Sequence, residues 1–274
     1  MELAERAREP FENHLYWCLE GNNLIEGSLI EKSDFHLPGQ LGTVGVNVLC
    51  AIQHAIVREF RTYAYLEVGS FKGKSLLPHV LSNNCTKAVS IDLRPAQTPD
   101  IRGAIYKYDH VTAEQMIGSI AGYASKKNLQ KLSTFTADSS IVATELQNER
   151  FEMAFIDGEH TVEGALFDVE NLRPVLADDS VLVFDDNSLV YPAIEAAYYL
   201  LSDWPCRKMQ HFNGGISALI LGGRLTIDDF KLRPRFLSST EKVAKSHGAI
   251  LSNRVPQSSH RLTNASDGTR SVTK

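Results

Sequence analysis

Short apolar runs alternate with amphipathic segments through most of this chain. Runs of five or six residues that predict strands cover Tyr63–Val68, Ala88–Asp92, Leu132–Ala137, Met153–Asp157 and Val181–Asp185. Segments with helical spacing of apolar residues lie between or after them, at about 74–82, 111–128, 139–147, 161–174 and 190–203. Apolar strands that alternate with helices of this length predict an α/β fold, in which parallel βαβ units form a sheet with helices on both faces.

The pattern changes at both ends. Residues 1–60 carry no strand pattern, and Phe11–Leu19 and Val44–Phe60 are predicted to be helices. We interpret this segment as an N-terminal helical cap that covers a substrate or forms a homodimer contact. Its aromatic residues Phe11, Tyr16 and Trp17 can equally belong to a packed core.

The C-terminal part departs from parallel order. Cys206–Phe212 and Ile216–Leu221 flank Asn213-Gly214-Gly215, which predicts an antiparallel hairpin. The main domain is thus expected to span residues 61–235. From 236 to 274 the chain is rich in polar residues and poor in apolar ones, so we predict a disordered tail.

Composition narrows the class of protein. The chain has 274 residues, 43% of them hydrophobic, and a net charge of −5, which gives no electrostatic footprint for nucleic acid. No run of 18 apolar residues predicts a membrane span, and the charged N-terminus lacks the apolar segment of a signal peptide. Four scattered cysteines suit free thiols, so we expect a cytoplasmic protein.

The most informative stretch is Tyr-Leu-Glu-Val-Gly-Ser-Phe-Lys-Gly-Lys-Ser at residues 65–75. A strand, a glycine turn and a helix start together form a cradle for a nucleotide or cofactor. A phosphate-binding loop needs four residues between its first glycine and Gly-Lys-Ser, and only three stand here. The arrangement with Glu67, Gly69 and Gly73 instead resembles the first motif of class I S-adenosylmethionine (SAM) methyltransferases.

That resemblance implies a Rossmann-like, seven-stranded, mostly parallel sheet whose C-terminal hairpin is antiparallel. It also implies that the glycines make room for the methionine part of SAM, and that Glu67 holds the loop or the amino group. The cofactor-binding residues expected on this basis are Glu67, Gly69, Ser70, Gly73, Ser75, Asp92, Asp138, Ser139 and Asp157.

Two of these positions have independent reasons and open alternatives. Asp92 follows the glycine turn by about 20 residues, the spacing at which a carboxylate binds ribose hydroxyls. The alternative to ribose binding is that Asp92 is a helix-capping or surface aspartate. Asp138 and Ser139 resemble the adenine-contacting position, but either can also cap the following helix.

Acidic residues end the fourth and fifth strands, in Asp157-Gly158-Glu159-His160 and Asp185-Asp186-Asn187. Parallel neighbours would place these ends side by side, and such oxygen ligands suit Mg²⁺. The pair resembles the metal site of cation-dependent O-methyltransferases of the catechol and caffeoyl-CoA type. It resembles still more closely a broad bacterial methyltransferase group with Asp-Gly-Asp-His at this place.

The resemblance implies Asp157, Asp186 and Asn187 as metal ligands, with Asp185 as an extra carboxylate. His160 stands where the catechol type has its lysine base. We therefore expect SAM-dependent O-methylation of a small-molecule hydroxyl, with Mg²⁺ lowering the pKa of that hydroxyl and His160 accepting its proton. Two acidic turns without metal are the alternative for the site. For the protein, the alternatives are a SAM-binding fold without catalysis and a nucleotide hydrolase or kinase that depends on Lys74.

Overall fold

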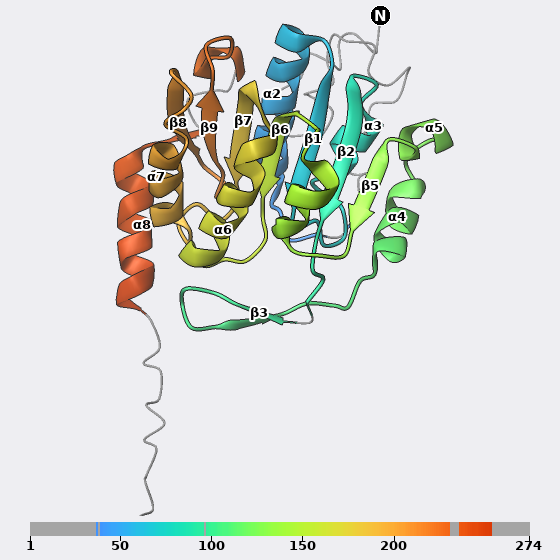
Figure 1. The fold of residues 1–274 in the computed structure, drawn as a ribbon. Coiled ribbons are helices and arrows are strands. Elements are labelled where there is room, and N and C mark those ends of the chain that lie inside the picture. The colour runs from blue at the N-terminus through green and yellow to red at the C-terminus, as the bar shows by residue number, and fades with distance from the viewer. Residues whose placement is uncertain (1–36, 38, 96, 231–235, 254–274) are drawn as a thin grey trace, which may run out of the picture.

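The computed structural model describes residues 37, 39–95, 97–230 and 236–253. These residues form an eight-stranded sheet with the strand order β10-β8-β9-β7-β6-β1-β2-β5 (Figure 1). Its strands are β1 (Tyr63–Val68), β2 (Cys85–Ile91), β5 (Leu132–Phe135), β6 (Phe151–Ile156), β7 (Leu176–Phe184), β8 (Arg207–Phe212), β9 (Ser217–Leu221) and β10 (Leu237–Ser238). From β7 to β5 every pairing is parallel, whereas β9, β8 and β10 pair antiparallel. The predicted seven-stranded sheet with its antiparallel hairpin is confirmed, and β10 adds a short eighth strand.

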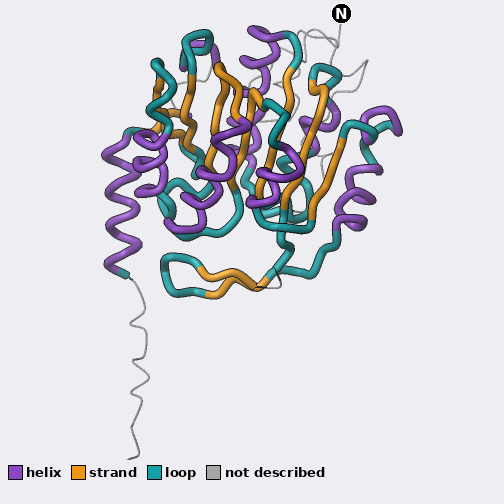
Figure 2. Tube along the Cα trace, viewed as in Figure 1, coloured by secondary structure: helices purple, strands orange, loops and turns teal. Residues whose placement is uncertain are grey.

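Helices cover both faces of the sheet (Figure 2). They are α2 (Thr43–Phe60), α3 (Leu77–Leu81), α4 (Ala113–Ala121), α5 (Lys126–Leu129), α6 (Val162–Leu172), α7 (Tyr191–Leu200) and α8 (Thr240–Ser252). Alternate residues of β1 enter two different cores. Tyr63 and Tyr65 pack with residues of α2, α3 and α4, while Leu66 and Val68 pack with residues of α6 and α7.

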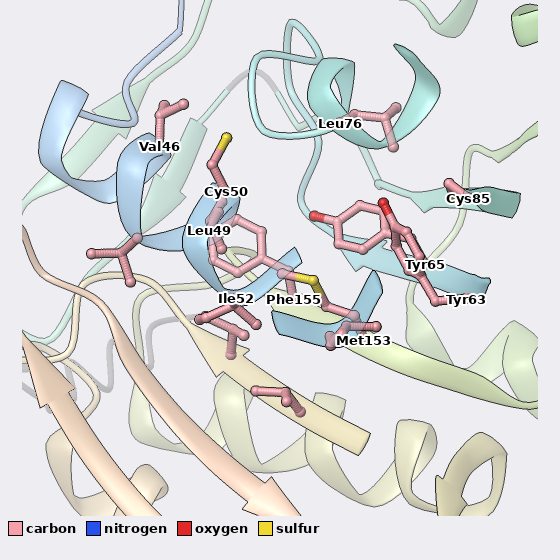
Figure 3. Packing of buried hydrophobic residues seen from close by; sticks show 14 of the residues in the cluster. Val46, Leu49, Cys50, Ile52, Tyr63, Tyr65, Leu76, Cys85, Met153 and Phe155 are labelled. Atoms are coloured by element: carbon pink, nitrogen blue, oxygen red, sulfur yellow. The ribbon is translucent and has the colours of Figure 1, made fainter. Parts of the chain in front are cut away.

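Helix α2 belongs to the core of the sheet domain. Its residues Val46, Leu49 and Ile52 are at most 1% exposed and share one cluster with Tyr65 of β1 and Phe155 of β6 (Figure 3). The predicted boundary between residues 60 and 61 therefore does not separate two cores. The predicted helix Phe11–Leu19 lies outside the described residues.

The C-terminal prediction is wrong for residues 236–253. Leu237 and Ser238 pair with β8, and Ser239 caps α8 by accepting from the backbone N–H of Lys242. Only one stripe of α8 is apolar, with Val243 buried and Ile250 packed against the core of α6 and α7. One apolar stripe is enough to dock a helix. The low average apolar content of this segment therefore did not reveal that α8 packs against the domain.

Other differences lie in the connections. A two-stranded hairpin of β3 (Gln97–Pro99) and β4 (Ile105–Lys107) stands between β2 and α4 and was not predicted. The predicted helix over 139–147 is a 3₁₀ turn, Ser139–Ile141, followed by a π turn, Val142–Leu146. Two further 3₁₀ turns cover Arg173–Val175 and Ile227–Phe230. Among the helices that the structure describes, none is long and apolar enough to cross a membrane.

Candidate active site

A cavity of about 430 Å³ lies where β1, β2, β5 and β6 end. This is the edge at which open α/β sheets bind ligands. Its lining includes most of the predicted cofactor residues, namely Gly69, Ser70, Ser75, Asp92, Asp138, Ser139 and Asp157, together with the predicted base His160. Glu67, Gly73 and the predicted metal ligands at 185–187 are not among the lining residues.

The glycine loop leaves β1 through Gly69, which has a φ of +87°. A Cβ here would lie 2.0 Å from the carbonyl oxygen of Asp157. The loop then closes by a 2.7 Å hydrogen bond from the N–H of Gly73 to the carbonyl of Ser70. A Cβ on Gly73 would meet Ile120 of α4 at 2.8 Å, so this glycine lets α4 pack against the loop.

Asp92, at the end of β2, is 8% exposed and ties the loop in place. Its Oδ2 accepts from the backbone N–H of Phe71, and its Oδ1 accepts from that of Arg94, each at 2.7 Å. Arg94 in turn donates from Nη1 to the carbonyl of Phe71 at 2.9 Å. The predicted ribose ligand is thus also the residue that joins β2 to the glycine loop.

Glu67 lies beneath the loop and is fully buried. Its carboxyl accepts from the hydroxyl of Tyr65 at 2.5 Å and from that of Ser75 at 2.9 Å. Burial raises the pKa of Glu67 to about 7, although these hydrogen bonds oppose the shift. Of the two roles expected for Glu67, holding the loop agrees with these contacts.

Beyond β5, Asp138 caps the 3₁₀ turn by accepting from the N–H of Ser140 at 2.9 Å. The hydroxyl of the buried Ser139 donates to Asp168 of α6 at 2.7 Å. Burial raises the pKa of Asp168 to about 6, against the effect of the Ser139 hydrogen bond. The capping alternative for Asp138 therefore holds, while both Asp138 and Ser139 line the cavity.

His160 lies between two acidic turns, after β6 and after β7. Its Nδ1 is 3.2 Å from Oδ2 of Asp186, and its Nε2 is 3.6 Å from Oδ1 of Asp157. Burial, and then the charges of Asp186, Glu67 and Asp92, raise the pKa of Asp157 well above its ordinary value. Burial, and then the charges of Asp157 and Asp186, raise the pKa of Asp185 well above its ordinary value. These carboxyl groups oppose one another's ionisation, and a cation bound beside them would favour their ionised forms.

The predicted magnesium ligands do not form a ready-made metal site. In the part of the chain that the structure describes, no group of three His, Cys, Asp or Glu side chains is arranged to hold a metal ion. The side-chain amide of Asn187 donates to the carbonyl of Ile216 at 2.9 Å and is 5% exposed. The imidazole ring of His160 lies between Asp157 and Asp186, in the place that a shared metal ion would need. As they stand, these residues do not fit Mg²⁺.

Lys74 does not have the setting of a phosphate-loop lysine. Its Nζ donates to the carbonyl of Leu41 at 2.8 Å, and the helix that follows, α3, has five residues and begins at Leu77. Burial lowers the pKa of Lys74. These contacts fix the segment before α2 against the loop.

Sequence reasoning missed residues that reach the cavity from the connection between β2 and α4. Arg94, Tyr108 and Val111 all line it. The only signal was the alternation in Ile105-Tyr106-Lys107-Tyr108, which is typical of a short strand.

Comparisons with known proteins agree with this geometry. Residues 66–187 match a protein-family model described as a methyltransferase domain. A search of curated protein sequences finds no match.

Among solved structures, the chain is similar to the O-methyltransferase NovP, with a TM-score of 0.52 and 12% identity over 68% of this chain and 84% of that one. It is also similar to the O-methyltransferase TomG from Streptomyces achromogenes, solved with SAM (0.45; 13% identity; 68% and 82% covered). A third is a putative caffeoyl-CoA O-methyltransferase from Staphylococcus aureus (0.46; 13%; 81% and 96%). Of these three structures, NovP has a TM-score above 0.5, and at 12% identity its likeness to the chain is a likeness of fold. Together with the family match over residues 66–187, the sheet order and the glycine loop, this likeness shows that the described part of the chain has the fold of a class I SAM-dependent methyltransferase domain.

Proposed function

We propose that this domain transfers the methyl group of SAM to a hydroxyl oxygen of a small molecule. The observation that carries the proposal is the position of His160, which lines the cavity and has a carboxylate beside each ring nitrogen. A hydroxyl must lose its proton to become a good nucleophile, so a base at the cavity wall is the group that O-methylation requires.

The residues fit SAM. A side chain at Gly69 would strike the end of β6, so the cradle depends on the bare glycine. The cavity wall carries the carboxyl groups of Asp92 and Asp157, and a cationic cofactor beside them would favour their ionised forms. We propose that Asp92 binds the ribose, that Asp138 and Ser139 lie along the adenine, and that Gly69 and Ser70 border the methionine part. When bound, SAM supplies a methyl group already activated on a sulfonium.

His160 is arranged to hold and accept protons at different atoms. Oδ2 of Asp186 lies 3.2 Å from Nδ1, so we propose that the neutral ring holds its proton at Nδ1, which leaves the lone pair on Nε2. Nε2 is 3.6 Å from Asp157, beyond a good hydrogen bond, so it can accept the proton of an acceptor hydroxyl. The resulting imidazolium would lie between two carboxylates, which stabilise its charge.

Neighbouring structures support oxygen as the methylated atom. NovP and TomG are both described as O-methyltransferases. The fold alone does not select the acceptor, because one fold can carry different activities. A cavity of this size, with the base on its wall, favours a small molecule.

Magnesium assistance is a separate proposal. The acidic residues Asp157, Asp185 and Asp186 favour a cation by charge, but their arrangement around His160 does not fit one. The mechanism proposed above uses no metal. Titration calorimetry with Mg²⁺ and Mn²⁺, on the protein and on an Asp157→Asn variant, tests the matter directly, because a metal held by these carboxylates binds the first and not the second.

The function itself is tested in two steps. Calorimetry should show binding of SAM or S-adenosylhomocysteine and none of ATP. Incubation of a small-molecule extract with SAM labelled on its methyl group should then give a labelled product whose methyl group is on oxygen. Cofactor binding without any labelled product would favour the alternative of a SAM-binding fold without catalysis, and label on nitrogen or carbon would overturn O-methylation.

A further inference from the structure

The connection between β2 and α4 lies across the cofactor edge of the sheet. We call residues 93–112 the arm; it contains the β3–β4 hairpin, which lies beyond the ends of β1 and β2 in Figure 1. Five of its residues, apart from Arg94, Tyr108 and Val111, also border the cavity: Leu93, Pro95, Gln97, Thr98 and Asp109. The arm is therefore a wall of the candidate site and not a peripheral loop.

Three contacts fix the arm to the catalytic edge. Arg94 donates to the carbonyl of Phe71 in the glycine loop at 2.9 Å. Lys72 and Asp109 form an ion pair at 2.8 Å. At the far side, the N–H of Ile101 donates to the carbonyl of His160 at 3.2 Å. The arm thus bridges the cofactor loop and the predicted base.

A row of rings follows the same path. Phe71 and Tyr108 meet edge to face with centroids 5.5 Å apart, and Tyr108 and Tyr106 lie nearly parallel at 6.3 Å. Tyr106 then meets His160 edge to face at 5.9 Å. Of these rings, Phe71, Tyr108 and His160 line the cavity. Aromatic side chains therefore follow one another from the glycine loop to the base, and the ring of Tyr108 is part of the cavity wall between them.

Tyr108 also brings a polar group to this surface. It is half-buried, and its hydroxyl makes no hydrogen bond to another group that the structure describes. Burial, with the charges of Asp157 and Asp186, raises the pKa of Tyr108 to about 12, so its hydroxyl stays protonated and can donate. A free donor beside two carboxylates and a ring surface is well suited to orient a hydroxyl-bearing ring.

We infer that Tyr108 is a positioning residue for the methyl acceptor, and that the acceptor carries its hydroxyl on a flat aromatic ring. The acceptor ring would pack on Tyr108 and Phe71, and the Tyr108 hydroxyl would donate to an oxygen on that ring, which turns the reacting hydroxyl toward Nε2 of His160. This inference rests on the proposed function and adds to it the class of acceptor and the residue that selects it.

Catechol serves as the probe. It is added to the protein already saturated with S-adenosylhomocysteine, and its binding is measured by titration calorimetry. Tyr108→Phe should weaken catechol binding about 3- to 10-fold, the usual effect of losing one hydrogen bond. Tyr108→Ala should weaken it further, because the ring surface is also lost. Tyr199→Phe is the matched control, since Tyr199 is 72% exposed and does not line the cavity.

Two readouts separate positioning from a general structural effect. Affinity for S-adenosylhomocysteine and the melting temperature should not change in Tyr108→Phe. trans-Cyclohexane-1,2-diol, which has two hydroxyls on a saturated ring, should bind at least 10-fold more weakly than catechol. The inference is overturned if catechol does not bind the saturated complex, if it binds the Tyr108 variants equally well, or if the saturated diol binds as tightly. Failure of the proposed function would appear elsewhere, as absent cofactor binding or absent label transfer by the wild-type protein.

Discussion

Gly69 and the carbonyl oxygen of Asp157 lie so close that a Cβ on residue 69 would be 2.0 Å from that oxygen. The contact joins the ends of β1 and β6, two central neighbours in the sheet. Both partners are main-chain groups, which cannot swing aside as a flexible side chain can. The glycine loop and the turn that carries His160 can therefore lie this close together only because residue 69 has no side chain.

Gly69→Ala should disrupt both stability and cofactor binding. The substitution adds backbone strain at a φ of +87° and a main-chain clash. The matched control is Gly103→Ala, where φ is +76° but nothing lies within 4 Å of the new Cβ. Strain alone should cost Gly103→Ala about 1–2 kcal/mol in the free energy of unfolding. Urea unfolding and calorimetry with S-adenosylhomocysteine measure the difference; equal effects of the two substitutions would contradict the role given to the Asp157 contact.

Asp92→Ala should weaken SAM binding about 10- to 150-fold, as expected for loss of charge-assisted hydrogen bonds. The loss has two sources, the proposed ribose contact and the bonds to the N–H groups of Phe71 and Arg94 that shape the loop. Asp228→Ala, at an exposed carboxylate away from the cavity, is the control. An unchanged Kd for SAM in a folded Asp92→Ala protein would refute the assignment.

Glu67→Gln should remove part of the dependence of stability on pH. The pKa of Glu67 is raised from 4.5 to about 7, so the folded state holds a proton that the unfolded state has lost. Stability from the protonated form is complete below about pH 4.5 and is lost as the pH rises through 7. The wild-type protein should therefore lose about 3 kcal/mol relative to the Gln variant across this window. Urea unfolding of both proteins from pH 4.5 to 8 measures the difference, and parallel curves would show that Glu67 is ionised at all these pH values.

His160→Ala should lower the rate of methyl transfer by about 10²–10⁴, the usual contribution of a general base. SAM affinity should change little, because the proposed cofactor contacts come mainly from the ends of β1, β2 and β5. His110→Ala, at an exposed histidine of the arm, is the matched control. Measurement uses labelled SAM with an acceptor that the wild-type protein methylates. Undiminished turnover in His160→Ala would transfer the base role to another group.

Removal of α8 should destabilise the domain. Truncation after Ser238 deletes the buried Val243 and the contact between Nδ1 of His247 and the carbonyl of Ser188, 2.9 Å long. We expect the melting temperature to fall by several degrees, about what 1–3 kcal/mol produces in a domain of this size. Lys245→Ala, on the exposed side of α8, should leave it unchanged. If the truncated protein melts like the full chain, α8 contributes nothing to the fold.

The local pattern of the amino-acid sequence was sufficient to predict the sheet and the edge of it at which the cofactor is expected. The bounds of the strand Tyr63–Val68 were predicted to the residue. A short apolar run of residues that favour strands, ended by a glycine, is compatible with few other local structures. The neighbourhood of Asp157 and Asp186 also followed from the sequence, since ends of adjacent parallel strands meet at one edge. These features depend on local pattern and on strand order, which the chain states directly.

The contacts of each polar side chain, in contrast, could be read only from the folded chain. Glu67 lies under the loop with Tyr65 and Ser75, Ser139 binds Asp168, and His160 lies between two carboxylates where a metal was expected. Such pairings join residues far apart in the chain or on different faces of a turn, and they depend on distances of a few tenths of an ångström. Helix α8 and the arm escaped prediction for a related reason. Each is weakly patterned by itself and is stabilised by the surface against which it packs.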